Sequence, residues 1–341
     1  MRSSDHAAVN LSIVIPCFNE ELVLPRTAER IAGVLEDLCL RGRIRRSSRI
    51  FLVDDGSGDS TWRIIEQLTD DGWPIVGIKL SRNRGHQHAL LAGLHQADGD
   101  AVISMDADLQ HDPAAIEPML DEYLNGHDVV LGIRKSRTAE SWFKRTSGTL
   151  YYRMLKGMGV DIVPEHADYR LLSRRAIAAL RQFGETELFL RGIIPQLGFP
   201  TAKIHYQQAE RAAGESKYSL AKMLGLAIQG VTSFSAAPLR FITLLGVLVS
   251  IASLGFSAYA LWIRLLTDTA LPGWASTVVP MYFLGGIQLL CLGIIGEYLS
   301  KIYIETKRRP AYIIEKVHAG EPRPSRTPSR RHRAAREAVA G

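Results

Sequence analysis

The sequence contains few cysteines and none of the glycine-rich loops that bind nucleotides. Its three cysteines, Cys17, Cys39 and Cys291, are odd in number and lack metal-site spacing, so neither a zinc site nor a disulfide framework is indicated. No Gly-x-Gly-x-x-Gly follows an expected strand, and no Gly-x4-Gly-Lys-Ser/Thr occurs anywhere. The missing loops disfavour a dehydrogenase and a kinase.

Charged residues are absent from two long stretches near the C-terminus. The chain of 341 residues is 22% charged, yet residues 241–263 and 271–295 contain no charge. Each stretch is long enough to cross a bilayer core of ~30 Å, and Trp274 and Tyr282 are candidate anchors at the interface. We expect two transmembrane helices within residues 239–300, which leave the preceding and following segments on one side of the membrane.

A secretory signal is also lacking, because the polar extension of residues 1–10 has no apolar core. The net charge of +6 is concentrated in a basic tail over residues 301–341. Basic residues beside a span indicate its cytoplasmic end and favour anionic lipid headgroups over nucleic acid. We expect a multi-pass cytoplasmic-membrane protein whose main domain and tail are cytoplasmic. The Pro, Ser and Arg content predicts a disordered tail after about residue 321.

Apolar runs alternate with helical patterns through the first part of the chain. Four runs are typical of strands, at residues 11–16, 50–53, 75–80 and 101–103, and amphipathic patterns follow the first three. This alternation predicts an α/β fold with a mostly parallel sheet. Each run ends in a polar cluster. Because ligands bind beyond the carboxyl ends of such strands, we expect the functional site at that edge.

The cluster after the fourth run carries two carboxylates two residues apart. Asp106, Asp108 and the carboxamide Gln110 alternate, so their side chains point to one side of an extended backbone. Three oxygen ligands suit a hard divalent cation such as Mg²⁺ or Mn²⁺, which commonly shares its coordination with substrate phosphates. A solvated turn at the end of a strand is the alternative interpretation.

Four segments together resemble the family 2 glycosyltransferases of the GT-A fold. They are residues 14–20 (VIPCFNE), 53–57 (VDDGS), 83–85 (NRG) and 106–110 (DADLQ). Later segments strengthen the resemblance to polyprenyl-phosphate glycosyltransferases, the group of dolichyl-phosphate mannose synthase and bactoprenol glucosyltransferase. These are residues 168–172 (DYRLL), 214–218 (GESKY) and 296–299 (GEYL).

The resemblance covers about residues 11–315 and implies a division of the chain. A GT-A catalytic domain is expected over residues 11–215, followed by a juxtamembrane amphipathic segment over 216–238 and the two spans. The implied reaction moves one sugar from a nucleotide-diphosphate sugar to a polyprenyl phosphate, such as undecaprenyl phosphate, with inversion at the anomeric carbon. A UDP-sugar is preferred over a GDP-sugar, and the sugar itself has no readable code in the sequence.

Family likeness also suggests roles for individual residues. Around the nucleotide it places Pro16, Phe18, Glu20, Asp54, Asp55, Asp106 and Ala107. Loop or capping roles are the alternative for each. The cation on Asp106, Asp108 and Gln110 would neutralise the departing diphosphate, which makes Asp108 a catalytic residue as well.

The acceptor phosphate requires cations near this acidic cluster. Candidates are Arg134, Arg137 and Lys217, for which solvated or lipid-facing charges are the alternative. Asp168 is expected to act as a base or to orient the nucleophile, with a structural cap as the alternative. A strong base is less necessary than for a sugar hydroxyl, since the phosphate is already ionised at pH 7.

Other patterns permit more than one interpretation. Residues 142–158 mix aromatic, apolar and basic side chains, which suits either an interfacial helix or a helix packed on the sheet, and residues 220–231 are similar. The histidines His86, His88 and His95 could suggest a metal site, but His86 and His88 would point to different faces of a helix, so a structural or surface role is expected. Small residues in the second span, Gly285, Gly286 and Gly293, permit helix association, so a homo-oligomer remains an open alternative.

Two other functions compete with lipid-phosphate glycosylation. A processive polysaccharide synthase of the same fold would carry a Gln-x-x-Arg-Trp segment and more spans, and the sequence has neither. A catalytically silent scaffold or lipid-binding protein would have no reason to retain Asp106, Asp108 and Gln110 together. The leading hypothesis is therefore a membrane-anchored glycosyltransferase.

Overall fold

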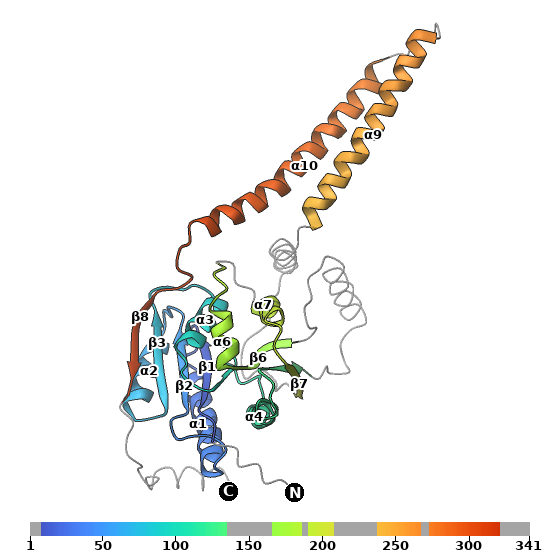
Figure 1. The fold of residues 1–341 in the computed structure, drawn as a ribbon. Helices are drawn as coiled ribbons and strands as arrows, with labels where there is room; N and C mark the ends of the chain where they lie inside the picture. The colour runs from blue at the N-terminus through green and yellow to red at the C-terminus, as the bar shows by residue number, and fades with distance from the viewer. Residues whose placement is uncertain (1–7, 135–165, 186–189, 208–236, 267–272, 321–341) are drawn as a thin grey trace.

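The computed structural model describes residues 8–134, 166–185, 190–207, 237–266 and 273–320. They form an α/β domain around an eight-stranded sheet, with two long helices extending away from it (Figure 1). The strands are β1 (Leu11–Cys17), β2 (Arg49–Asp54), β3 (Ile75–Leu80), β4 (Ala101–Ser104), β5 (Val129–Arg134), β6 (His166–Ser173), β7 (Thr201–Tyr206) and β8 (Ile314–Ala319). Their order in the sheet is β7-β5-β6-β4-β1-β2-β3-β8.

The four expected strands form the centre of this sheet. Strands β1 to β4 pair in parallel, with β1 between β2 and β4. Strand β6 runs antiparallel between β4 and β5, and β7 pairs in parallel with β5. The beginning of β6 therefore lies at the edge where β4 and β5 end. This reversal brings residues 166–168 beside the acidic turn that follows β4.

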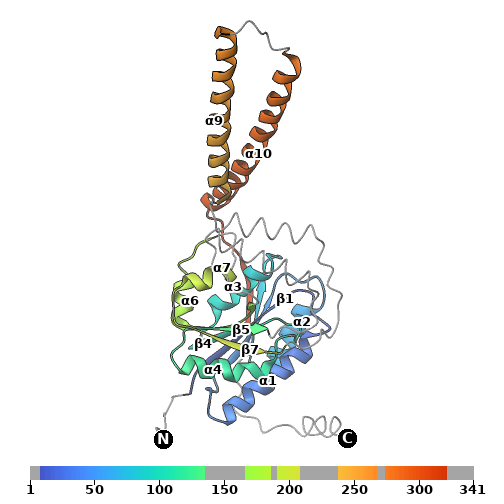
Figure 2. The same ribbon diagram turned by 90° about the vertical axis from the view of Figure 1, so that its right-hand side faces the viewer.

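Helices cover both faces of the sheet (Figure 2). Their bounds are α1 (Leu24–Leu40), α2 (Thr61–Asp70), α3 (His86–Gln96), α4 (Ile116–Leu124), α6 (Arg174–Leu180) and α7 (Leu190–Gln196), with a short 3₁₀ turn, η1, at Pro113–Ala115. Buried side chains of α1, α2 and α4 belong to one apolar cluster, and those of α3, α6 and α7 to the other. Helix α3 packs so closely that a Cβ on Gly93 would lie 2.3 Å from Val14 Cγ1. Glycine at this position permits the close contact between helix and sheet.

Two long apolar helices follow, α9 (Ala237–Leu266) and α10 (Trp274–Thr306). Both are long and apolar enough to cross a membrane, over Pro238–Phe256 and Phe283–Thr306. Large side chains such as Phe256 and Leu289 are exposed on them, as expected for helices that contact lipid. These two candidate membrane helices indicate membrane association. The side chains of Trp274 and Tyr282 lie outside the described residues.

The segment after the second apolar helix returns to the domain as β8. Residues 301–320 were expected to belong to a basic tail. Instead, α10 continues to Thr306, and β8 pairs antiparallel with β3. Two ion pairs and a histidine contact hold the strand in place: Lys79 pairs with Glu315 at 3.0 Å and Lys316 with Glu66 at 2.7 Å, and His318 Nε2 lies 2.8 Å from Asp70 Oδ1. Its six residues, IEKVHA, lack the continuous apolar run that identified the central strands. Residues after 320 lie outside the described chain.

Candidate active site

The loops that follow β1 and β2 are joined by hydrogen bonds at the carboxyl edge of the sheet. The Asn19 N–H donates to Ser57 Oγ at 3.0 Å, and the Gly58 N–H donates to Asn19 Oδ1 at 2.9 Å. The Glu20 N–H donates to Thr61 Oγ1 at 2.9 Å. Asn19 has a φ of 56°, a left-handed conformation that asparagine adopts more readily than most residues. The two loops thus form one unit.

Asp55 connects this unit to the loop after β3. Its Oδ1 accepts the Arg84 N–H at 2.7 Å, and its Oδ2 accepts the Gly85 N–H at 2.8 Å. Burial raises the pKa of Asp55, and the two backbone donors only partly oppose that rise. Gly56 has a φ of 69°, and a Cβ there would lie 2.6 Å from the Asn83 nitrogen. Only glycine fits this close approach of the two loops.

The neighbouring Asp54 is buried at the end of β2. Its Oδ1 accepts the Ser57 N–H at 3.2 Å, whereas Oδ2 has no hydrogen-bond partner within the described residues. Burial raises the pKa of the Asp54 carboxyl. Asp54 and Asp55 therefore both make contacts within the loops, which is the alternative role expected for them from the sequence. Nucleotide binding by these two residues stays a prediction.

Pro16 and Phe18 have different environments at the end of β1. Pro16 is buried opposite Val53, and β4 ends its pairing with β1 at Ser104, opposite Val14. The absence of a backbone N–H at Pro16 therefore costs no hydrogen bond to β4. Phe18 is 46% exposed. Of the two, only Phe18 offers an exposed ring at the site.

The expected acidic turn lies after β4 and is fixed from two sides. The Ala107 carbonyl accepts the Thr27 hydroxyl of α1 at 2.6 Å. The Asp106 N–H donates to His111 Nδ1 at 3.1 Å, and His111 Nε2 lies 3.6 Å from Asp106 Oδ2. His111 is buried and stacks on Tyr169 at a centroid distance of 4.8 Å. The carboxylate of Asp106 is thus oriented by a histidine packed against the core.

Asp108 and Gln110 close the same turn. The Gln110 N–H donates to Asp108 Oδ1 at 3.1 Å, and Leu109 between them has a φ of 56°. A left-handed conformation is costly for leucine and is typical of a turn constrained by its surroundings. Gln110 is buried, so this turn does not present all three proposed ligands equally to solvent.

Negative charge accumulates where the turn meets the loop after β1. The pKa of Glu20 is raised, first by burial and then by Asp108, Asp59 and Asp106. Within the described residues, no three His, Cys, Asp or Glu side chains are arranged to hold a metal ion by themselves. The oxygen donors nonetheless fit a hard divalent cation that takes its remaining ligands from substrate phosphates. Cation binding here stays a prediction.

His86 lies in the site, which the sequence analysis did not expect. Its Nε2 is 3.5 Å from Asp106 Oδ1 and 3.6 Å from Asp168 Oδ2. Burial alone would lower the pKa of His86, but the two carboxylates outweigh burial and raise it. The expectation of a structural role is confirmed for His88, whose Nδ1 is 2.9 Å from the Arg84 carbonyl, and for His95, whose Nδ1 is 2.8 Å from the Tyr312 hydroxyl. His86 instead contacts two of the proposed site residues, so a role in the site is a new prediction for it.

Asp168 is a strand residue of β6 and not a helix cap. Its buried carboxylate pairs with Arg170 and accepts hydrogen bonds from Arg191, at 3.1 Å from Nη2 to Oδ2 and 3.4 Å from Nε to Oδ1. Burial would raise the pKa of Asp168, but His86, Arg170 and Arg191 together hold it well below its usual range. The carboxylate is therefore ionised at neutral pH. The Ser104 hydroxyl donates to the Asp168 carbonyl at 2.6 Å, which ties β6 to β4.

Arg170 is a fully buried cation beneath this carboxylate. Apart from the Asp168 pair, its Nε and Nη1 have no hydrogen-bond partner within the described part of the chain. Burial lowers its pKa, and the charge of Asp168 opposes that fall. The ion pair is a fixed part of the core, because neither side chain reaches open solvent.

Arg134 ends β5 at the same edge and is exposed. It lies opposite Tyr206 of β7, whose pKa is raised by burial and lowered again by Arg134. Its expected role in acceptor binding stays a prediction. Arg137 and Lys217 lie outside the described residues, as do both candidate interfacial helices.

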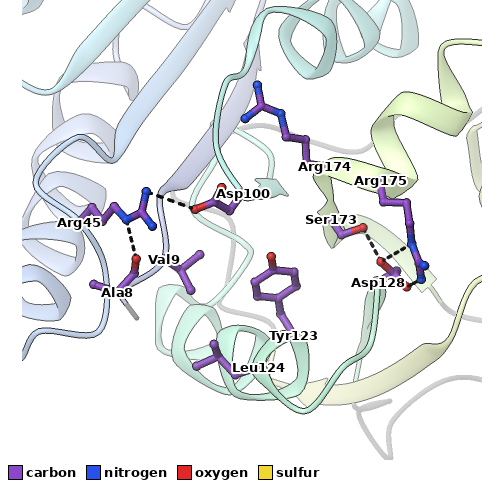
Figure 3. Close-up of a pocket in the computed structure, with 10 residues that line it drawn as sticks. All are labelled: Ala8, Val9, Arg45, Asp100, Tyr123, Leu124, Asp128, Ser173, Arg174 and Arg175. Atoms are coloured by element: carbon purple, nitrogen blue, oxygen red, sulfur yellow. Dashed lines mark hydrogen bonds and ion pairs between the residues drawn. The ribbon is translucent and has the colours of Figure 1, made fainter. Parts of the chain in front are cut away.

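A pocket at the opposite end of the strands is separate from this site (Figure 3). Asp100 precedes β4 and Asp128 precedes β5, so the pocket lies at the amino edge of the parallel strands. Asp128 accepts the Ser173 hydroxyl at 2.7 Å and pairs with Arg175, and Arg45 lies 3.9 Å from Asp100. Both aspartates of this pocket are thus paired with arginines.

Four site residues were missed by the sequence analysis. His111 directly follows the acidic turn, and His86 follows the Asn-Arg-Gly segment, so a search of the residues flanking each motif would have included both. Arg170 lies inside the segment of residues 168–172. On a strand, side chains two residues apart lie on the same face, so Arg170 could have been predicted to lie beside Asp168. Arg191 had no comparable signal, because only folding brings α7 to Asp168.

Comparison with known proteins places this arrangement in a family. The model for glycosyl transferase family 2 matches residues 12–181. "Uncharacterized glycosyltransferase YkoT" of Bacillus subtilis (strain 168) is 44% identical over 307 residues, which are 89% of this chain and 91% of the relative. "Bactoprenol glucosyl transferase" of Shigella phage SfII is 36% identical over 315 residues, 92% of this chain and all of the relative.

A solved structure that matches part of the chain is glucosyl-3-phosphoglycerate synthase from Mycobacterium tuberculosis, in complex with Mn²⁺, UDP and glucosyl-3-phosphoglycerate. It is 17% identical, with a TM-score of 0.42 over 66% of this chain and 78% of that chain. The family match agrees with the GT-A type sheet expected from the sequence. The chain belongs to glycosyltransferase family 2 and is an enzyme of the glycosyltransferase class.

Proposed function

We propose that this enzyme transfers one sugar from a nucleotide-diphosphate sugar to a polyprenyl phosphate at the cytoplasmic face of a membrane. Relatives named bactoprenol glucosyl transferase support the lipid acceptor and make undecaprenyl phosphate the first choice. The single observation that carries the proposal is the division of charge at the site. Acidic side chains gather after β1 and β4, whereas Arg134, Arg170 and Arg191 lie on β5, β6 and α7.

The acidic half suits the donor. Glu20, Asp54, Asp55 and the exposed Phe18 surround the place proposed for the nucleoside, with UDP preferred. Asp106, Asp108 and Gln110 would hold Mg²⁺ or Mn²⁺, which supplies positive charge to the departing diphosphate. His111 keeps the Asp106 carboxylate in one orientation for this role.

The basic half suits an anionic acceptor. A phosphate oxygen is ionised at pH 7 and needs no strong base. Asp168 would be a poor proton acceptor, because three neighbours hold its pKa well below the usual range. We therefore assign Asp168 to orienting the groups around the nucleophile. A single displacement inverts the anomeric centre.

The position of the apolar helices agrees with a lipid acceptor. The Ser81 N–H, just beyond β3, donates to the Ile313 carbonyl at 3.0 Å, and Arg84 Nη2 donates to the Pro310 carbonyl at 3.4 Å. The carboxyl edge of the sheet is thus the edge next to the segment leaving α10. Lys307, Arg308 and Arg309 follow α10 and favour a cytoplasmic location for this end.

Sugar transfer in detergent tests the proposal. The purified full chain is incubated with undecaprenyl phosphate, Mg²⁺ or Mn²⁺, and a panel of radiolabelled UDP- and GDP-sugars. We expect a chloroform-soluble product from one donor, lost on chelation with EDTA and in Asp106→Asn. Asp98→Asn, which changes an exposed carboxylate away from the site, is the matched control and should retain activity. Folded wild type that glycosylates no lipid phosphate from any donor would refute the proposal.

A further inference from the structure

Two arginines share the carboxylate of Asp168, and they differ in their access to solvent. The Arg170 side chain is 1% exposed and Asp168 is 8% exposed, whereas the Arg191 side chain is 43% exposed. Arg170 and Asp168 neighbour each other on β6, while Arg191 approaches from α7. Arg170 is therefore the permanent partner of the carboxylate, and Arg191 is the partner that can move.

The charges around Asp168 exceed what one carboxylate requires. Arg170 already compensates its single negative charge, and His86 Nε2 lies 3.6 Å from the same Oδ2 atom that Arg191 contacts. Water solvates the half-exposed guanidinium of Arg191, which reduces what this second ion pair adds to the stability of a carboxylate already paired with Arg170. Arg191 is therefore the partner of Asp168 that is available to contact a ligand from solvent.

Arg191 and Arg134 lie within electrostatic reach of one common residue. Both oppose the rise in the Tyr206 pKa that burial causes, although they come from α7 and β5. Tyr206 also packs edge-on against His111, at a centroid distance of 5.7 Å, and His111 orients Asp106. Both exposed arginines therefore lie near Tyr206, which connects through His111 to the acidic turn.

We propose that Arg191 binds the phosphate of the acceptor and that Asp168 holds its guanidinium in place before the acceptor arrives. This inference rests on the proposed function. A guanidinium donates two parallel hydrogen bonds, which match carboxylate and phosphate oxygens alike. Entry of a phosphate monoester lets Arg191 exchange one anion for another while Arg170 continues to compensate Asp168. The donor diphosphate would have its own cation on the acidic turn, so Arg191 is left to join Arg134 in binding the acceptor phosphate.

Steady-state kinetics with two variants tests this assignment. Arg191→Gln should raise the KM for undecaprenyl phosphate by about 10- to 100-fold, as expected for losing a hydrogen-bonded charge, with the donor KM changed less than about twofold. Arg191→Lys keeps the positive charge but cannot donate two parallel hydrogen bonds. Its KM for undecaprenyl phosphate should lie between those of wild type and Arg191→Gln. Arg175→Gln is the matched control, because it also removes an exposed arginine paired with an aspartate of this sheet, but at the opposite edge. It should leave both KM values unchanged.

An equilibrium measurement separates the inference from the reaction. Binding of undecaprenyl phosphate in detergent, followed by ³¹P NMR without donor or divalent cation, should weaken in Arg191→Gln and not in Arg175→Gln. Weakened binding in Arg191→Gln beside a wild type that transfers no sugar would refute the proposed function and leave this inference standing. Transfer with unchanged acceptor affinity, or a raised donor KM alone, would overturn the inference only. Wild type that binds no lipid phosphate would overturn both.

Discussion

His95 Nδ1 lies 2.8 Å from the hydroxyl of Tyr312, and this contact joins α3 to the segment between α10 and β8. The same segment contacts the loop after β3 through Arg84 and Ser81. That loop donates the two N–H groups that hold Asp55. The chain leaving the second apolar helix is therefore packed directly against one wall of the proposed nucleotide site.

The first prediction concerns the pH dependence of stability. Burial lowers the pKa of His95 from 6.5 to about 4, so the folded protein favours the neutral ring. Between these values the unfolded chain binds more protons, and stability falls as pH falls through that window. Above pH 6.5 this contribution is fully present. We expect the melting temperature of wild type to fall more steeply from pH 7 to pH 4.5 than that of His95→Asn. Parallel curves would contradict the prediction.

The second prediction concerns the close approach of two loops at Gly56. Gly56→Ala introduces a Cβ that would lie 2.6 Å from the Asn83 nitrogen, in a backbone with φ of 69°. We expect a loss of about 1–3 kcal/mol in unfolding free energy and a higher KM for the donor, since the Asp55 contacts shift. Gly58→Ala is the control, because nothing lies within 4 Å of its Cβ. Denaturant unfolding and donor kinetics measure both effects.

The third prediction concerns the buried cation. Arg170→Met leaves the Asp168 carboxylate with its exposed partners alone, and we expect a loss of about 3–5 kcal/mol in unfolding free energy. Adding Asp168→Asn should recover part of that loss, because the buried carboxylate that Arg170 stabilises is then replaced by a neutral amide. A double-mutant cycle by chemical denaturation measures the coupling. Additive losses from the two substitutions would show that the pair is not coupled.

The fourth prediction concerns the returning strand. Truncation after residue 313 removes β8 and opens the edge of β3, whereas truncation after residue 320 removes only the chain beyond the strand. We expect the first variant to lose about 3 °C or more in melting temperature, equivalent to about 1 kcal/mol, and the second to melt like wild type. Equal melting of the two variants would mean that β8 contributes nothing to the domain.

The sequence predicted the parts of the fold that depend on local patterns. Apolar runs located β1 to β4, and the amphipathic pattern after the first run located α1, whose buried residues include Leu24, Ala28, Ile31 and Leu35. The motifs also located the acidic turn of Asp106 and Asp108. Each of these depends on residues close together in the chain, where periodicity is informative.

Long-range pairing limited the rest of the prediction. The meeting of Asp168 with His86 depends on the antiparallel insertion of β6 between β4 and β5, which no local pattern indicates. Arg191 depends on how α7 packs across the same edge. Strand β8 is short, polar and far from its partner β3, so charge in residues 301–320 suggested a tail. Sequence patterns thus predicted the elements better than their contacts.

The late position of β8 also has a consequence for biosynthesis. Its partner β3 ends at Leu80, and both apolar helices are synthesised before Ile314 emerges from the ribosome. Until then one edge of the sheet presents unpaired backbone groups, which are prone to pair with other chains. Completion of the sheet must therefore wait until both apolar helices and β8 have been synthesised. A chain that stops before Ile314 would leave that edge of β3 exposed.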